Sequence, residues 1–458
     1  MIASSNAISP SGGFRWLQLA MGIVCMAMIA NLQYGWTLFV DPIDAKYNWG
    51  RAAIQLAFTI FVMTETWLVP VEAWFVDKYG PRIVVMFGGV MIGIAWVLNA
   101  YASSLMTLYA AAVIAGVGAG AVYGSCVGNA LKWFPDRRGL AAGATAAGFG
   151  AGAALTVAPI ASMIASGGYQ NAFFTFGIGQ GLVVLVLAFF IRAPEVIVPA
   201  KKKQLSLPQT AIDFTPPQVL RTRIFWVMYL AFVTVASGGL MTAAQIAPMA
   251  RDFGIANSPV TLAGFQMAAL TFAISLDRIF DGFGRPFFGW ISDNIGREYT
   301  MCIAFGVAAL MLLTLSAYGH IPIIFVLSTA IYFGVFGEIY SLFPATSCDT
   351  FGAKFATTNN GMLYTAKGTA SLLVPLASVI SSHFGWQAVF IVAVALNATA
   401  ALMALFVIKP LRRAFILGNE IAAETAASRP KTVRRPEPLI ENMDLVEEKA
   451  ARLVKRDG

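Results

Sequence analysis

The chain has 458 residues, of which 58% are hydrophobic and only 12% are charged, and its mean hydropathy is +0.71. An ordinary soluble domain carries about 25% charged and 45–50% apolar residues, so this composition excludes a single soluble core. The formal net charge of +8 is typical of the cationic loops of a membrane protein, and we expect no nucleic-acid partner.

The apolar residues form blocks of roughly 20 or more, the length that crosses a hydrocarbon core of about 30 Å as a helix. Membrane β-barrels instead show segments of about 10 residues with alternating polarity, which are not seen here. The blocks predict an all-α polytopic membrane protein embedded in the lipid bilayer. Its 12 transmembrane helices are expected at 16–40, 52–75, 83–102, 106–133, 139–165, 172–191, 224–249, 260–291, 300–318, 322–344, 360–382 and 388–408.

These spans divide the chain into two pseudo-symmetric six-helix halves, residues 16–191 and 224–408. Between them, residues 192–223 contain three consecutive lysines and read as a solvated linker. Residues 1–15 form a short N-terminal segment. Residues 409–458 mix both charge signs with few aromatic residues and are expected to form a mobile tail.

The distribution of Lys and Arg predicts the orientation in the membrane. Of the 31 basic residues, 25 fall on the side of the two termini and the linker, 3 fall on the other side, and 3 lie within spans. Cytoplasmic loops carry the excess of basic residues. We therefore expect both termini and the linker to be cytoplasmic, in an inner (cytoplasmic) cell membrane.

Sites for metals, cofactors or catalysis are not indicated. The four cysteines lie far apart and the two histidines fall in short connections, so we expect neither a disulfide framework nor a metal site nor a cofactor. The spans contain no nucleophile with a matching base, and the chain has no GxxxxGK[ST] loop for ATP. We expect the protein not to be an enzyme.

One element occurs twice, once after the second span and once after the eighth. Each copy has an acidic residue at a helix end, then a glycine turn and a basic residue, and the two aspartates are 216 residues apart. The turn needs a residue that tolerates positive φ. The charges are expected to lock neighbouring helices at the cytoplasmic end as a gate. The copies comprise Asp77, Gly80 and Arg82, and Asp293, Gly296 and Arg297.

The paired elements resemble the loop signature G-x-x-x-D-[RK]-x-G-[RK]-[RK] of the major facilitator superfamily. Asn294 and Glu298 occupy positions that are basic in that signature, and Ala73 stands where its first glycine is usual. The resemblance implies two six-helix halves around a central linker, with a substrate site near the membrane midplane between them.

Two charged residues deep in the second half indicate a binding site, because a charge within hydrocarbon is costly. Arg285 lies in the eighth span and Lys367 near the middle of the eleventh. Facing one cavity, they would suit a small anion, since Arg binds carboxylates bidentately and Lys supplies a compact charge. The alternative is that each is neutralised by an internal acid and only braces the bundle.

Acidic residues within the spans leave both interpretations open. Asp277, Asp281 and Arg285 follow at intervals of four residues and so share a helix face, with Arg278 three residues before Asp281. Acids buried in an apolar environment can carry a proton and be uncharged. These groups are therefore either ion-pair partners or sites of charge balance and proton coupling, and two further candidates are Glu338 and Glu65.

Aromatic residues are expected close to these charges. Aromatic residues within helices usually belong to the core, but a tyrosine beside a cavity can also donate a hydrogen bond to a carboxylate. Gln33 would add a polar contact. The aromatic candidates are Tyr34, Tyr123, Phe149, Phe336, Tyr340 and Tyr364.

Several short strings resemble the oxalate–formate antiporter family of this superfamily, over about residues 15–410. They are 33–38 (QYGWTL), 76–82 (VDKYGPR), 133–141 (WFPDRRGLA), 284–289 (GRPFFG), 340–344 (YSLFP) and 366–371 (AKGTAS). The resemblance implies carboxylate transport, with Arg285 and Lys367 binding the dianion inside a cage made by the six aromatic residues. Phe149 stands where the family has tyrosine, and Phe336 and Tyr364 stand where it has tryptophan.

We therefore predict a secondary active transporter of small carboxylate anions, of the oxalate/formate exchange type, that works by alternating access. Two alternatives stay open. One is a proton-coupled monocarboxylate symporter, with protons as a second partner. The other is a non-transporting membrane sensor on the same scaffold, although the 50 residues after the last span are short for a signalling domain.

The charge asymmetry is testable by labelling intact cells. In a cysteine-free variant, Lys46→Cys should react with an impermeant maleimide about tenfold or more faster than Lys202→Cys, because only position 46 is expected outside. Equal reactivity at the two positions would contradict the orientation.

Overall fold

The computed structural model describes residues 12–194 and 208–427, and these are almost entirely helical. Within them, eight helices are long and apolar enough to cross a membrane, or nine when the bent pair α4–α5 counts as one. The 51-residue α8 is much longer than one crossing requires. Both α8 and α16 contain a glycine with positive φ, Gly168 (80°) and Gly385 (77°), at which two helices meet at a kink.

The first half contains eight helical segments. In chain order they are α1 (Gly12–Ile29), α2 (Asn31–Tyr34), α3 (Thr37–Tyr47), α4 (Arg51–Trp67), α5 (Val69–Tyr79), α6 (Pro81–Tyr101), α7 (Leu105–Trp133) and α8 (Arg138–Ala188). Counting α1–α3 and α4–α5 as one crossing each and α8 as two gives six crossings in this described part of the chain.

The second half also gives six crossings when α13–α14 is one and α15–α16 is two, divided at Gly385. A short surface helix, α9 (Pro216–Leu220), precedes it. The other elements are α10 (Arg223–Asp252), β1 (Pro259–Leu262), β2 (Phe265–Ala268), α11 (Ala269–Ile295), α12 (Arg297–Tyr318), α13 (Pro322–Phe336), α14 (Ile339–Phe351), α15 (Ala356–Ser371), α16 (Val374–Met403), the π-helical η2 (Ala404–Ile408) and α17 (Lys409–Ala427).

Two expectations from the sequence are wrong. The start of the predicted 260–291 span is an antiparallel hairpin, in which β1 and β2 pair from Pro259↔Ala268 to Leu262↔Phe265 around Ala263 and Gly264 at positive φ. Hydropathy alone does not distinguish such a hairpin from a helix. Residues 409–427 form α17 rather than a mobile tail, and buried side chains such as Phe415 hold this helix against the bundle. The lysines at 201–203 and residues 428–458 lie outside the described chain.

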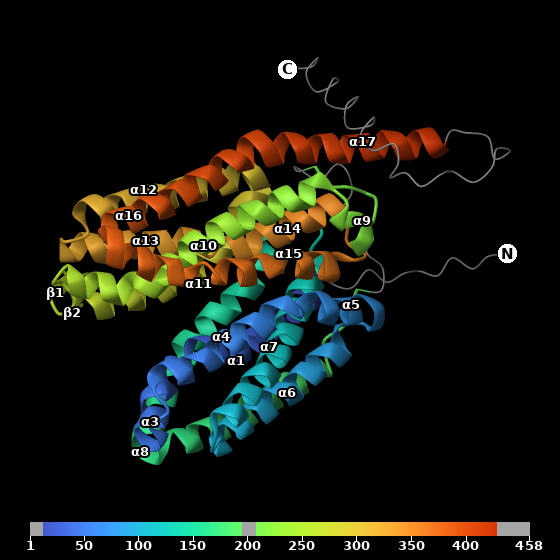
Figure 1. Ribbon diagram of the computed structural model, residues 1–458. Helices are drawn as coiled ribbons and strands as arrows, with labels where there is room; N and C mark the ends of the chain where they lie inside the picture. Colours follow the sequence, from blue (N-terminus) through green and yellow to red (C-terminus); the bar gives the residue numbers. More distant parts are fainter. Residues whose placement is uncertain (1–11, 195–207, 428–458) are drawn as a thin grey trace.

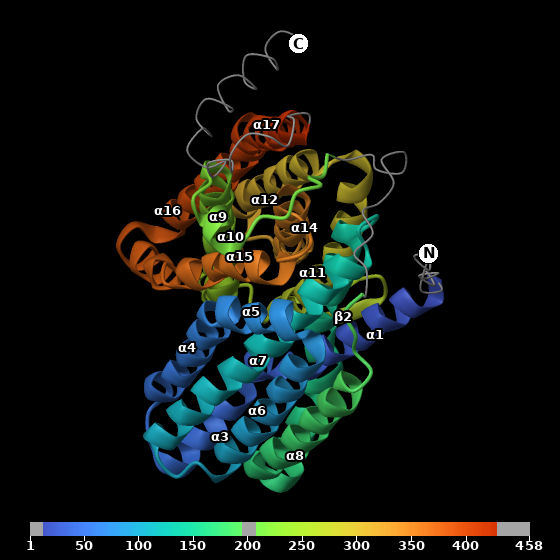
Figure 2. The ribbon, with the colours of Figure 1, turned by 90° about the vertical axis from the view of Figure 1, so that its right-hand side faces the viewer.

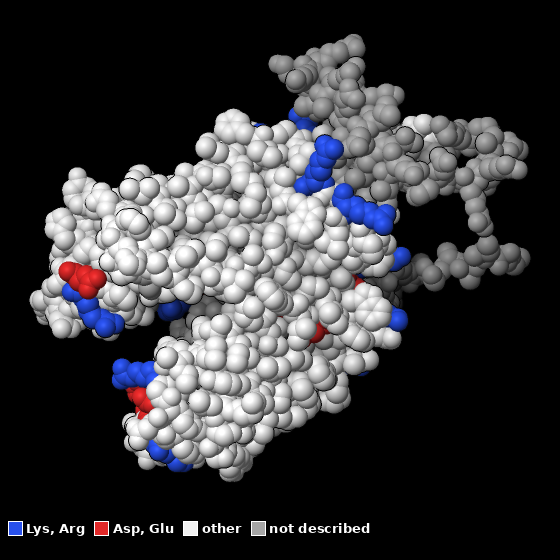
Figure 3. All heavy atoms as spheres, viewed as in Figure 1, with Lys and Arg blue, Asp and Glu red and all other residues white. Residues whose placement is uncertain are grey.

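The two halves lie side by side and meet closely at one end of the bundle (Figures 1 and 2). We call this end, which carries α9, α17 and the turns after α5 and α11, the terminal face. The opposite end, which carries the β hairpin and the α3–α4 turn, is the distal face. Between the halves α8 packs against α11 and α5 packs against α15. Figure 3 shows that Lys, Arg, Asp and Glu gather at the two ends, and that the molecule is hollowed between the halves at the distal face.

Several helices are interrupted between the two faces. The helix pair α4–α5 bends by 40° at Leu68, α13 and α14 are separated at Gly337–Glu338, and α15 ends at Ser371. Discontinuous helices at this depth are typical of transporter binding sites, because the broken helix leaves polar groups next to a cavity.

Glycines allow the helices that carry the central charges to approach closely. A Cβ on Gly116 would lie 2.9 Å from the amide nitrogen of Glu65 in α4, and one on Gly120 would lie 2.8 Å from its carbonyl oxygen. In the same way, a Cβ on Gly143 of α8 would clash with the carbonyl group of Arg285 in α11. Small residues at such spacing let helix backbones pack in contact. They therefore set the positions of Glu65 and Arg285 relative to the other helices.

Candidate functional site

Lys367 is buried between the two halves and is paired with an acid from the opposite half. Its Nζ lies 3.1 Å from Oε2 of Glu65 in α4 and donates to the hydroxyl of Tyr364 at 2.9 Å. The Tyr364 hydroxyl in turn donates to Oε1 of Glu65 at 3.0 Å, and Oε1 of Gln33 lies 3.4 Å from the lysine Nζ. Glu65 is completely inaccessible to solvent and Lys367 is 4% exposed.

Arg285 is also paired, but with an acid of its own helix. Its Nη2 lies 2.7 Å from Oδ2 of Asp281, one turn earlier in α11. Its Nη1 donates to the carbonyl oxygen of Ala146 in α8 at 2.9 Å, so this side chain also reaches the other half. The guanidinium carbon lies 4.9 Å from the ring centroid of Tyr340, and Lys367 Nζ lies 5.9 Å from the same centroid. The two cations therefore border one aromatic ring.

The six aromatic candidates form a continuous chain of ring contacts around these cations. Three come from the first half and three from the second, and consecutive ring centroids are 4.5–6.3 Å apart. Such distances are those of edge-to-face and stacked pairs, which shield the enclosed polar groups from water. In order of contact the rings are Tyr34, Phe149, Tyr123, Tyr364, Tyr340 and Phe336.

The acids within the spans, whose roles the sequence could not distinguish, have different partners in the structure. Asp281 faces Arg285, while Arg278 lies over the ring of Tyr34 with its guanidinium carbon 4.9 Å from the centroid. Asp277 and Glu338 are buried but make no ion pair with either cation in the described chain. Both carboxylate oxygens of Glu338 lie without a hydrogen-bond partner among the described residues.

At the terminal face, the repeated aspartates bond to helix N-termini across the interface. Asp77 of α5 accepts from the backbone amide of Thr358 in the first turn of α15 at 2.8 Å and pairs with Lys132 at 2.6 Å. Gly80 has φ of +87°, as the turn requires, whereas Arg82 is exposed in the first turn of α6. The amide and hydroxyl of Thr358 and the lysine are the partners of Asp77, and Arg82 is not.

The second copy makes the reciprocal contact. Asp293 of α11 accepts from the amides of Gly139 and Leu140, in the first turn of α8, at 2.9 Å each. It also pairs with Arg297 at 2.6 Å, across Gly296 with φ of +111°. Carboxylates at helix N-termini are stabilised by the free amides and by the helix dipole.

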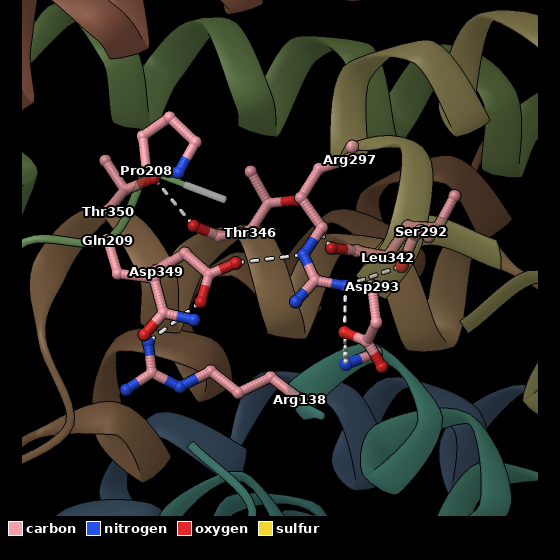
Figure 4. Close-up of polar contacts among 12 residues, drawn as sticks. Arg138, Pro208, Gln209, Ser292, Asp293, Arg297, Leu342, Thr346, Asp349 and Thr350 are labelled. Atoms are coloured by element: carbon pink, nitrogen blue, oxygen red, sulfur yellow. Dashed lines mark hydrogen bonds and ion pairs between the residues drawn. The ribbon is translucent and has the colours of Figure 1, made fainter. Parts of the chain in front are cut away.

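A third aspartate, Asp349 at the end of α14, joins arginines of both halves (Figure 4). It lies 2.8 Å from Arg138 of the first half and 2.9 Å from Arg297 of the second, and its side chain is fully buried. Arg412 of α17 lies 3.9 Å from the same carboxylate and 2.7 Å from Glu298. This cluster closes the terminal face.

Known proteins resemble this chain in sequence and in fold. The sequence model of the Major Facilitator Superfamily matches residues 19–375 and 272–446. The chain is 38% identical over 405 residues to the oxalate:formate antiporter of Oxalobacter formigenes, covering 88% of this chain and 93% of the relative. It is 26% identical over 298 residues to human monocarboxylate transporter 11, covering 62% and 58%. The structure of FucP in the outward conformation matches with a TM-score of 0.65 at 14% identity, covering 86% of this chain and 99% of FucP.

The chain belongs to the major facilitator superfamily. Within it, the match to the antiporter over most of both chains places the protein in the oxalate–formate antiporter family. The two halves and the twelve crossings predicted from the sequence are the superfamily's fold.

Some groups that hold this superfamily member together were not found from its sequence. The predicted tenth span ended at 344, so Asp349 fell in a loop and its burial was not expected. Arg138 stood in a string that resembles the family and Lys132 directly before it, but nothing local indicated their partners. Glu65 was recognised as an intramembrane acid, yet its pairing with Lys367 depends on two helices about 300 residues apart. Only the polar character of these residues within apolar surroundings could have indicated them.

If the Asp349 cluster holds the terminal face closed, removing its carboxylate should make the interface between the halves more accessible. Asp349→Asn leaves Arg138 buried without a carboxylate and takes one of two from Arg297, and breaking a buried pair costs about 3–5 kcal/mol. In a cysteine-free variant, Thr357→Cys reports on the interface, because Thr357 is buried against Gly128 of the other half. We expect Asp349→Asn to raise its maleimide labelling rate at least about tenfold. Asp136→Asn is the control, since its pair with Arg15 is exposed and contributes little. Equal rates in both variants would show that the cluster does not hold the face closed.

Proposed function

We propose that the protein is a secondary active transporter that exchanges small carboxylate anions by alternating access. The observation that supports this most is the placement of Arg285 and Lys367, both buried, at one ring of an aromatic cage that both halves build. A guanidinium and an ammonium group are the donors that recognise carboxylates. The exchange of ions needs no catalytic group, so we infer a transporter without enzymatic activity.

Alternating access follows from the difference between the two faces. The terminal face is closed by Asp77, Asp293 and Asp349, while the bundle is hollowed at the distal face. Opening the terminal face requires all three contacts to break while the distal face closes, with the cage between them. With the 25-to-3 distribution of basic residues, we infer that the terminal face is cytoplasmic and that the membrane is the inner one.

Oxalate and formate are the first substrates to test, because the relative that is 38% identical is named as an antiporter of these two anions. A dianion such as oxalate would use both cations. A monoanion such as formate would use one cation and leave the other with its internal acid.

Proton-coupled symport of monocarboxylates is the second candidate, and the charge balance favours it. Between the two faces, the described helices hold five acids, Glu65, Glu72, Asp277, Asp281 and Glu338, but only three cations, Arg278, Arg285 and Lys367. Unpaired charges in a low-dielectric interior are strongly disfavoured. At least two of these acids should therefore hold a proton, and the carboxylates of Glu72, Asp277 and Glu338 have no hydrogen-bond partner among the described residues.

Uptake by proteoliposomes tests the proposed function. Wild-type protein should exchange labelled oxalate, formate or another small carboxylate. Lys367→Ala should reduce this uptake to background, because the substrate loses a buried charge partner that is worth roughly 2–5 kcal/mol. The exposed Lys354→Ala, in the same half, should transport normally. Wild-type rates in Lys367→Ala for every carboxylate would rule out the site, and the absence of wild-type uptake of all of them would rule out the function.

Asp281 should set the preference for substrate charge. While it pairs with Arg285, Lys367 is the one cation that a substrate can take, by displacing Glu65, and a monocarboxylate is the better match. Asp281→Asn frees the arginine, and an unpaired buried charge costs about 3–5 kcal/mol. We expect the variant to prefer dicarboxylates and to depend less on external pH, as measured by competition between mono- and dicarboxylates at two pH values. The exposed Asp252→Asn serves as control. An unchanged ranking and pH profile would make Asp281 a structural brace.

A further inference from the structure

The ion pair between Glu65 and Lys367 differs from the other central pair in where its members lie. Asp281 and Arg285 are one turn apart on α11 and move together. Glu65 lies on α4 of the first half and Lys367 on α15 of the second, so their distance changes whenever the halves rock against each other. This pair is therefore sensitive to the transport cycle.

Glu65 presents its carboxylate in the way a substrate would. Lys367 approaches it at 3.1 and 3.4 Å, and the Tyr364 hydroxyl donates to it at 3.0 Å, inside the aromatic cage. An ammonium and a tyrosine hydroxyl within a ring of aromatic side chains are also the groups that would hold a substrate carboxylate. Glu65 thus occupies the position at Lys367 that a bound anion needs.

We propose that Glu65 is an internal counter-anion that competes with the substrate for Lys367 and allows the empty transporter to change conformation. This inference rests on the proposed carboxylate transport. An empty site with an unpaired lysine would resist closure, because the charge would be enclosed in a low-dielectric interior. With Glu65 in place, the charge of Lys367 is neutralised in the empty site. The empty protein can then return to its starting conformation, which net transport requires and strict exchange does not.

The groups around Glu65 determine what happens when substrate arrives. Lys367 and Tyr364 on α15 contact its carboxylate directly, and Tyr123 on α7, Glu72 on α5 and Gln33 on α2 lie beside this contact. Lys367 is the only cation that pairs with Glu65 in the described chain, and Arg285, across the Tyr340 ring, is already held by Asp281. A Glu65 displaced by substrate therefore loses its cation. A proton taken up with the substrate would neutralise it. Glu65 therefore links substrate binding to proton uptake in the symport mode.

A purely structural brace predicts a different outcome. If Glu65 only held the halves together, its loss would weaken binding, exchange and net transport alike. As a competitor, its loss should strengthen substrate binding, because the lysine no longer has to be released from an internal partner. The two roles therefore predict opposite signs for the change in affinity.

The experiment compares wild type, Glu65→Gln and Glu65→Asp in proteoliposomes at fixed pH with the membrane potential clamped. Exchange is the uptake of labelled oxalate or formate into vesicles loaded with the same unlabelled anion, and net transport is uptake into vesicles without it. Glu65→Gln should retain exchange within about threefold while the ratio of net transport to exchange falls at least about tenfold. Glu65→Asp keeps the charge and should restore part of the ratio.

Equilibrium binding in detergent gives an independent measurement on the same preparations. The dissociation constant of the exchanged anion should decrease about tenfold in Glu65→Gln. An unchanged ratio of net transport to exchange, or weaker binding in Glu65→Gln, would overturn the counter-anion role while wild-type exchange leaves the proposed function intact. If Glu65→Gln does not fold, Glu65→Asp with an unchanged ratio and unchanged affinity would overturn it equally. Absence of wild-type exchange would overturn both proposals.

Discussion

The neutralisation of charge in the middle of the bundle is the constraint on which the site depends. Neither lipid nor the apolar helix interior can solvate Lys367 or Arg285, so each needs an acid at hydrogen-bond distance. The glycines of α7 and α8 let α4, which carries Glu65, and α11, which carries Asp281 and Arg285, pack in close contact with these helices. The helix breaks beside these residues leave room for side chains between the halves. The ion pairs, the glycine contacts and the interrupted helices are thus parts of one arrangement.

Much of this arrangement could be predicted from the sequence, where the information is local. Apolar blocks of sufficient length indicate spans, and a spacing of four residues indicates that Asp281 faces Arg285, because both lie on one helix face. The pairing of Glu65 with Lys367 could not be predicted, since it depends on how α4 and α15 pack. The burial of Asp349 was missed for the same reason. Residues 260–268 were assigned to a helix because hydropathy reports the environment of a segment and not its backbone conformation.

The sequence repeat has a structural counterpart that its charges alone do not reveal. The acidic and basic residues suggested a local lock, but Arg82 of the first copy is exposed. Each aspartate instead accepts from free amides at the start of a helix in the opposite half, Asp77 from α15 and Asp293 from α8. Helix N-termini attract carboxylates through unsatisfied amides and the helix dipole, so a repeated aspartate needs no repeated cation across the interface.

These contacts connect the terminal face to the cage along two helix pairs. In the pair α11–α8, Asp293 bonds to the start of α8 and Arg285 bonds to the carbonyl of Ala146 further along the same helix. In the other pair, Asp77 of α5 bonds to the start of α15, and Glu65 of α4 pairs with Lys367 further along α15. Each interface thus has one contact at the closed face and one at a central cation. If substrate binds in the cage as proposed, it changes the partner of a cation in the same interface that the terminal aspartate holds. We infer from this that binding in the cage is coupled to opening of the terminal face.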